Sequence, residues 1–271
     1  MSKALIVSGC SFTECRSHDP NNWYTWPKHL HDILKDYGYD VFINKAMGSQ
    51  GNGLISRSLM YSVSKALTKY KPEDILVGVM WSGSSRLDYM NSRPDLMSWY
   101  GSNPDGWMEN PTSFVDNAEK KWIIMNPHWT NEEAQIYYKY FYDDVGAAIY
   151  SIEHILRLQY FLKDKKVPYF FTNFTDENIL INSKYVNDNK HEYDYLYELI
   201  DFNNYLPVSS EHRWVYDNAT TKEEFRARHL YNGTWCTWIH PNRQEHKEFA
   251  EQVIVPYLKN KNMIDTHMNE Q

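Results

Sequence analysis

Short apolar runs alternate with amphipathic stretches along this chain, which is the pattern of a parallel β-sheet covered by helices. The apolar runs predict buried strands at residues 4–7, 40–44, 74–81 and 168–174. Apolar residues at helical spacing follow them, at residues 26–34, 56–70, 132–163 and after Asn242. The run at 74–81 is nearly all apolar, which favours a strand buried on both faces. Strands alternating with helices predict an α/β fold with a central parallel sheet.

Two helix starts carry local signals. Pro27 suits the first turn of a helix that begins at Trp26. Asn242 is followed three residues later by Glu245, which predicts a capping box at the start of the last helix. Residues 132–163 read as a single long helix.

Residues 90–131 and 176–236 interrupt the alternation with loops and Pro/Gly turns. We interpret both as loop-rich insertions on the sheet rim of a single domain spanning residues 1–271. The first insertion and its margin are rich in aromatic residues, which are expected to fill a secondary core, although one or two could stack on sugar rings: Trp99, Tyr100, Trp107, Trp122 and Trp129.

Composition excludes several classes of function. The chain of 271 residues has a formal charge of −7 and dispersed basic residues, which argues against nucleic acid as the main partner. Its longest apolar runs fall well short of a membrane span, and the first residues lack a signal-peptide core. Three irregularly spaced cysteines fit a reducing compartment. A cytoplasmic location is expected, with a virion component as the alternative.

The candidate chemistry lies where strands end. In parallel sheets, ligands bind beyond the carboxyl ends of the strands. Ser11 follows the first predicted strand, Gly48 the second and Ser82 the third, while His240 precedes the last helix. These four segments are therefore expected to meet on one rim of the sheet.

The motifs at these positions resemble the SGNH (GDSL-type) hydrolases. Residues 9–13 read Gly-Cys-Ser-Phe-Thr, similar to the first block of that family, and residues 44–52 resemble its second block. His240-Pro241-Asn242 resembles the last block, and Trp26-Pro27 with Leu30 resembles the first helix of the family. The resemblance covers the first 90 residues and the last 35, in the family's order.

The resemblance implies a three-layer α/β/α fold and hydrolysis of an acyl ester, commonly an acetyl group on a sugar or lipid. Ser11 would be the nucleophile and His240 its general base. The N–H groups of Ser11 and of the Gly48–Ser49 turn, with Ser82 in place of a missing donor, would form the oxyanion hole. We assign Asn52, Trp81, Arg86 and Trp238 to the substrate site, although Asn52 also reads as a turn or cap residue and Arg86 as a rim salt bridge.

The chain departs from the family pattern at three places, and the first two weigh against activity. Thr237 replaces the aspartate that usually orients the histidine, so a backbone carbonyl, Thr237, Asp217 or Asp19 would have to orient His240. The oxyanion asparagine of the third block has no match in residues 81–86, where Ser82, Ser84 or a loop amide could substitute. Cys10 stands at the usual aspartate of the first block and is interpreted as a packing residue.

We therefore expect a serine esterase or deacetylase acting on a small-molecule or glycan ester, with no cofactor and no metal. A catalytically impaired binding or structural module, for example in a virion or envelope, is the alternative, and an acyltransferase is a third class. A metal site would have to use residues whose spacing fits no regular zinc pattern: Cys10, Cys15, His18, Cys236 and His240. No oligomeric state follows from the sequence.

Overall fold

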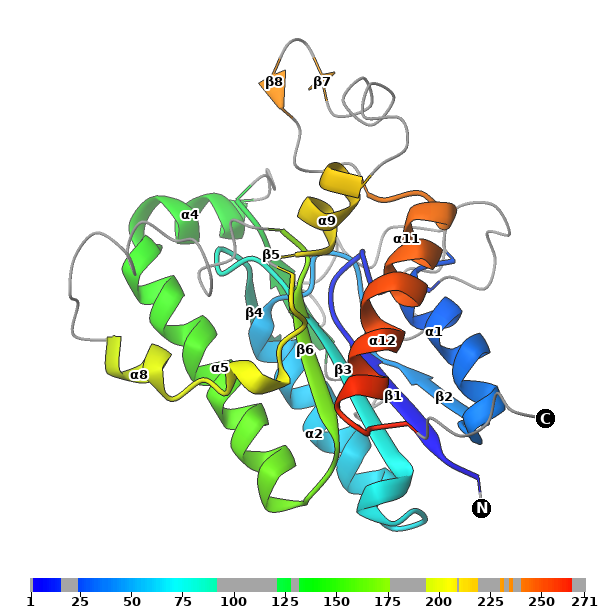
Figure 1. Cartoon of the computed structure of the whole chain (residues 1–271). Coiled ribbons are helices and arrows are strands. Elements are labelled where there is room, and N and C mark those ends of the chain that lie inside the picture. The colour runs from blue at the N-terminus through cyan, green and yellow to red at the C-terminus, as the bar shows by residue number, and fades with distance from the viewer. Residues whose placement is uncertain are drawn as a thin grey trace.

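The computed structural model places a four-stranded parallel sheet at the centre of the protein, so the α/β fold with a central parallel sheet is confirmed (Figure 1). Its strand order is β2 (Val41–Asn44), β1 (Ala4–Ser8), β3 (Ile75–Trp81) and β6 (Tyr169–Asn173). All three strand pairs are parallel. The structure describes residues 2–15, 24–91, 121–127, 132–175, 194–208, 210–218, 230–231, 234–235 and 240–264.

Helices cover both faces of the sheet (Figure 1). On one face, α2 (Asn52–Ala66) and α5 (Asp144–Asp164) pack over strand residues such as Ile6. On the other face, Leu5 and its same-facing neighbours pack under α1 and the C-terminal helical segments. Those segments are α1 (Trp26–Leu34), α11 (Arg243–Phe249), the π-helical stretch η5 (Ala250–Ile254) and α12 (Val255–Asn260). The alternation of side chains along each strand therefore separates two apolar cores.

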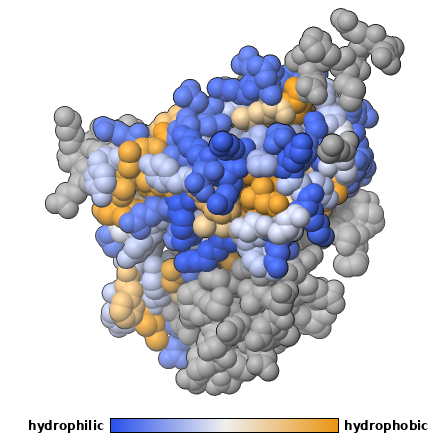
Figure 2. All heavy atoms as spheres, turned by 90° about the horizontal axis from the view of Figure 1, so that it is seen from below, coloured by the Kyte–Doolittle hydropathy of each residue, from blue (hydrophilic) through white to orange (hydrophobic). Residues whose placement is uncertain are grey.

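Smaller elements decorate this framework. β4 (Leu87–Asn91) and β5 (Lys121–Met125) form a separate antiparallel pair where the first insertion was predicted. The remaining elements are η1 (Lys35–Tyr37), η2 (Pro72–Asp74), α4 (Glu132–Tyr140), α8 (Asp194–Glu198), η4 (Phe202–Asn204), α9 (Glu211–Asn218), β7 (Leu230–Tyr231) and β8 (Thr234–Trp235). Seen from the end opposite α9 and α11, the coloured surface is largely hydrophilic with smaller apolar areas (Figure 2).

Most predicted elements are present, with two corrections. The single helix predicted over residues 132–163 is two helices, because Asp143 adopts extended backbone and accepts a hydrogen bond from the Gly146 amide at 2.8 Å, which starts α5 afresh. Helix α2 begins at Asn52 rather than at residue 56. The capping box of Asn242 and Glu245 is confirmed, with both of its hydrogen bonds formed.

The described helices are too short or too polar to cross a membrane. Of the aromatic residues singled out in the first insertion and its margin, Trp122 lies in β5 and pairs with Met90 of β4. The others lie outside the described residues: Trp99, Tyr100, Trp107 and Trp129.

Gly78 lets two aromatic rings approach the middle of the sheet. It pairs with Phe170 of β6, and a Cβ atom at Gly78 would lie 2.7 Å from Phe170 Cζ and 3.3 Å from Trp26 Cη2. Both rings are fully buried, so neither can turn away without opening a void. The glycine therefore fixes how α1 sits on the sheet.

We expect Gly78→Ala to lower the free energy of unfolding by about 1–3 kcal/mol, since the added methyl overpacks this contact. Urea denaturation measures the change. Gly83→Ala is the matched control, because the nearest atom to its Cβ lies at 3.8 Å and the substitution only restricts the unfolded chain. Equal stabilities of the two variants would contradict the proposed role of Gly78.

Candidate active site

The hydroxyl of Ser11 and the imidazole of His240 contact each other, although 229 residues separate them in the sequence. Ser11 Oγ lies 2.6 Å from His240 Nε2. Ser11 is in the turn after β1, and His240 is exposed just before α11. The distance is that of a direct hydrogen bond and suits proton transfer from the hydroxyl to the ring.

A tight turn holds Ser11 at the end of β1. The amides of Thr13 and Glu14 both donate to Cys10 O, at 2.9 and 3.0 Å. Gly9 permits this turn, since a Cβ there would lie 2.8 Å from Thr13 Cβ. Asn44 Nδ2 donates to Thr13 O at 2.7 Å, which ties the turn to the end of β2.

Aromatic packing supports the imidazole. The Phe12 ring lies against the His240 ring with centroids 4.6 Å apart, and Phe12 in turn meets Phe174 edge-on at 5.2 Å. Phe12 is 2% exposed, so its position is fixed by the core. The His240 ring therefore contacts two consecutive residues, the hydroxyl of Ser11 and the buried ring of Phe12.

A buried polar pair fixes α11, the helix that follows His240. His246 Nδ1 lies 2.6 Å from Glu211 Oε1 of α9, and both side chains are almost fully buried. Burial lowers the pKa of His246 to about 3 and raises the pKa of Glu211 well above its ordinary value. Both shifts favour neutral partners, a carboxylic acid donating to an imidazole.

The amide predicted for the oxyanion hole is occupied by a carboxylate. Gly48 N donates to Glu14 Oε2 at 2.9 Å. The next residue, Ser49, has a left-handed backbone with φ of 64°, and its Oγ accepts from Asn126 Nδ2 at 3.4 Å. Glu14 was not singled out in the sequence, although its place three residues after Ser11 was a usable signal.

A second carboxylate organises the start of α2. Asp88 of β4 accepts hydrogen bonds from the amides of Gly51 and Leu54, both at 2.9 Å. Burial raises the pKa of Asp88 to about 6, against the opposing effect of these hydrogen bonds and of nearby Arg57 and Arg86. This cap explains why α2 begins earlier than predicted.

The structure corrects two assignments to the substrate site. Asn52 is buried and exchanges hydrogen bonds with the backbone of Ser82, donating to Ser82 O at 2.9 Å and accepting from Ser82 N at 2.8 Å. The Ser82 amide is therefore engaged and does not point to an oxyanion. Trp81 is 0% exposed and packs edge-on against Phe171 in the core, so it does not line a surface site.

The sequence allowed two alternative roles for Arg86, a substrate contact or a rim salt bridge, and in the structure its side chain contacts a serine and an aromatic ring. Its Nη1 donates to Ser82 Oγ at 2.7 Å, and its guanidinium lies over the Phe174 ring at 5.1 Å from the centroid. Because Phe174 also contacts Phe12, Arg86 is linked through two rings to the Ser11 turn. Trp238, also assigned to the substrate site, lies outside the described residues.

Three side chains were considered for orienting His240. Asp217 accepts from Arg213 Nε at 2.9 Å on the exposed side of α9, while Asp19 and Thr237 lie outside the described residues.

Cys10, which was also considered as a metal ligand, is buried in the apolar core, as expected for a packing residue. Within the described ranges, no group of three His, Cys, Asp or Glu side chains is arranged to hold a metal ion.

Comparison with known proteins yields distant structural likenesses. A search of curated proteins finds no match. Protein YxiM from Bacillus subtilis superposes with a TM-score of 0.42 at 14% identity, over 97% of this chain and 57% of that one. The chain thus spans little more than half the length of that protein. A structure titled TesA superposes with a TM-score of 0.39 at 12% identity, over 95% of this chain and 99% of its own.

A family model matches the sequence of this chain directly. The model described as a family of unknown function, DUF6071, matches residues 13–270, nearly the whole chain. The protein therefore belongs to the DUF6071 family.

Proposed function

We propose that this protein is a serine hydrolase that cleaves an acyl ester, most simply an acetyl ester of a small molecule or glycan. The observation that carries the proposal is the 2.6 Å contact between Ser11 Oγ and His240 Nε2. A hydroxyl is a weak nucleophile alone, and an imidazole at this distance can accept its proton as the oxygen attacks a carbonyl carbon. The exposure of His240 leaves room for substrate beside the pair.

The reaction would run in two halves. Attack by Ser11 Oγ transfers its proton to His240 and forms a tetrahedral intermediate, and collapse releases the alcohol, which takes the proton from His240. Water then attacks the acyl-serine with His240 as base again. The amides of Ser11 and of the Gly48–Ser49 turn are the proposed oxyanion donors, since the Ser82 amide already donates to Asn52.

A binding module without catalysis is the second candidate, and one observation favours it. Glu14 occupies the Gly48 amide, so a proposed oxyanion donor is engaged by a carboxylate in this structure. A negatively charged oxygen at that position opposes the developing negative charge of a tetrahedral intermediate. The two candidates therefore differ in whether Glu14 leaves when an ester binds.

Ser11→Ala and His240→Gln are each expected to lower kcat/KM for 4-nitrophenyl acetate by about 10³-fold or more, because each removes one member of a unit that acts together. Initial rates measured spectrophotometrically give the comparison. Ser64→Ala and His154→Gln are matched controls on α2 and α5, and both should retain the wild-type rate. If all five proteins hydrolyse the ester at the same background rate, the binding module is the better description.

Glu14→Gln is expected to raise kcat/KM severalfold, roughly fivefold for each 1 kcal/mol of weakened competition for the Gly48 amide. A neutral carboxamide oxygen is a weaker acceptor than a carboxylate and does not repel the oxyanion. Glu14→Asp retains the charge and serves as the control. A fall in kcat/KM of Glu14→Gln at unchanged thermal stability would show that Glu14 assists the reaction instead of competing with it.

A further inference from the structure

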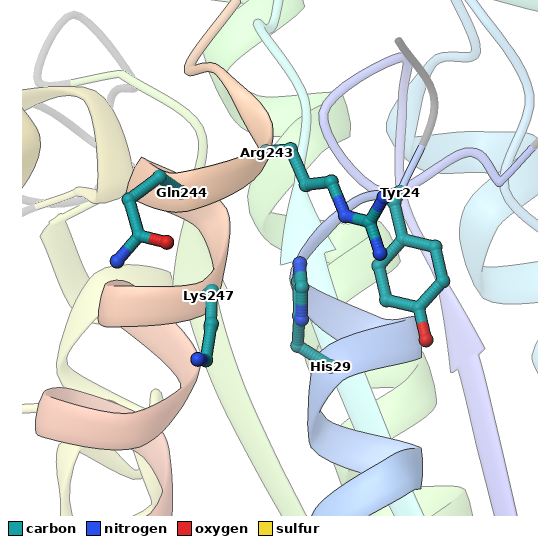
Figure 3. Close-up of a pocket in the computed structure, with 5 residues that line it drawn as sticks. All are labelled: Tyr24, His29, Arg243, Gln244 and Lys247. Atoms are coloured by element: carbon teal, nitrogen blue, oxygen red, sulfur yellow. The ribbon is translucent and has the colours of Figure 1, made fainter. Parts of the chain in front are cut away.

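A pocket of about 430 Å³ opens between α1 and α11. Its walls come from Tyr24 and His29 on the α1 side and from Arg243 and Lys247 of α11 (Figure 3). This volume falls in the range of about 300–1,000 Å³ typical of small-molecule sites. The mechanism proposed above uses none of these four side chains.

Arg243 is presented to the pocket by stacking. Its guanidinium carbon lies 4.3 Å from the centroid of the Tyr24 ring, so one face of the guanidinium is covered (Figure 3). Stacking leaves the N–H donors at the edge of the plane available for an oxyanion. Among the described residues, no carboxylate forms an ion pair with Arg243. Tyr24 is itself anchored, since its hydroxyl donates to Asp32.

Lys247 adds a second cation one helical turn further along α11. Its ammonium reaches Glu251 only at 3.7 Å, and both side chains are close to half exposed, so that pair is weak. The local charge of the α11 wall is therefore positive. This contrasts with the net charge of −7 for the whole chain.

His29 forms the inner wall without adding charge. The side chain is buried, its ring meets Tyr24 edge-on at 4.5 Å, and its Nε2 has no hydrogen-bond partner among the described residues. Burial, reinforced by His246 and Arg243, lowers the pKa of His29 to about 4, so the ring is neutral near pH 7. A buried imidazole nitrogen without a partner is costly unless a ligand or water can pair with it.

We propose that this pocket binds an oxyanion group, a phosphate or a carboxylate, through Arg243 and Lys247. Arg243 follows His240 by three residues, so their Cα atoms lie no more than about 10 Å apart. An anion in the pocket and an ester at Ser11 can therefore belong to one substrate. This extension to an anionic ester rests on the proposed function, whereas the binding of the anion does not.

The test measures binding and not turnover, so its failure and that of the esterase proposal are distinguishable. Inorganic phosphate and malonate are titrated separately into the full-length Ser11→Ala protein at constant ionic strength, with isothermal titration calorimetry as the readout. We expect a dissociation constant on the order of 1 mM for at least one of them. A preference for phosphate or for malonate identifies the chemical source of the oxyanion.

Arg243→Gln in the same background should weaken binding by about tenfold or more and Lys247→Gln by a smaller factor, since each removes a charge-assisted donor. The anion affinity of Arg243→Lys should lie between those of the parent and Arg243→Gln, because lysine keeps the positive charge but lacks the planar set of donors of arginine. Lys69→Gln, at an exposed lysine beyond the end of α2, is the matched control and should bind like the parent. Unchanged thermal stability confirms that the variants fold.

Two results would overturn the proposal. One is the absence of any heat of binding for both anions with the Ser11→Ala protein. The other is equal binding by Arg243→Gln and Lys69→Gln, which would place the anions on the general surface.

Discussion

The contact between Ser11 and His240 depends on where the two ends of the chain enter the sheet. β1 lies between β2 and β3, so the turn after it emerges from the middle of the carboxyl edge. The C-terminal helices return to the face that α1 covers, which places the start of α11 beside that turn. A buried Glu211–His246 pair and the Asn242 capping box then fix the helix, and with it the approach of the imidazole.

Two carboxylates hold the segment between β2 and the first turn of α2. Glu14 accepts from the Gly48 amide, and Asp88 accepts from the amides of Gly51 and Leu54. The two contacts differ in kind: Asp88 is buried and caps a helix, whereas Glu14 belongs to the turn that holds Ser11. Release of Glu14 from the Gly48 amide would leave the two hydrogen bonds of Asp88 to the start of α2 in place.

The sequence was most informative where local chemistry decides the structure. Apolar runs predicted the four strands of the sheet, and Asn242 with Glu245 predicted the cap that forms. It was misleading where a distant partner decides. Trp81 and Asn52 follow the strand-end pattern of a site, but the sheet buries one and the Ser82 backbone engages the other. The start of α2 depends on Asp88, 36 positions after Asn52, and no periodicity signals that pairing.

The most direct test of the central claim is covalent capture of the nucleophile. The full-length protein is treated with a serine-directed fluorophosphonate and digested, and the modified peptide is identified by mass spectrometry. The account predicts a single phosphonylated peptide that contains Ser11, with the labelling rate strongly reduced in His240→Gln, because the imidazole must accept the hydroxyl proton. A folded wild-type protein that carries no adduct, or carries it on a serine other than Ser11, would contradict the account.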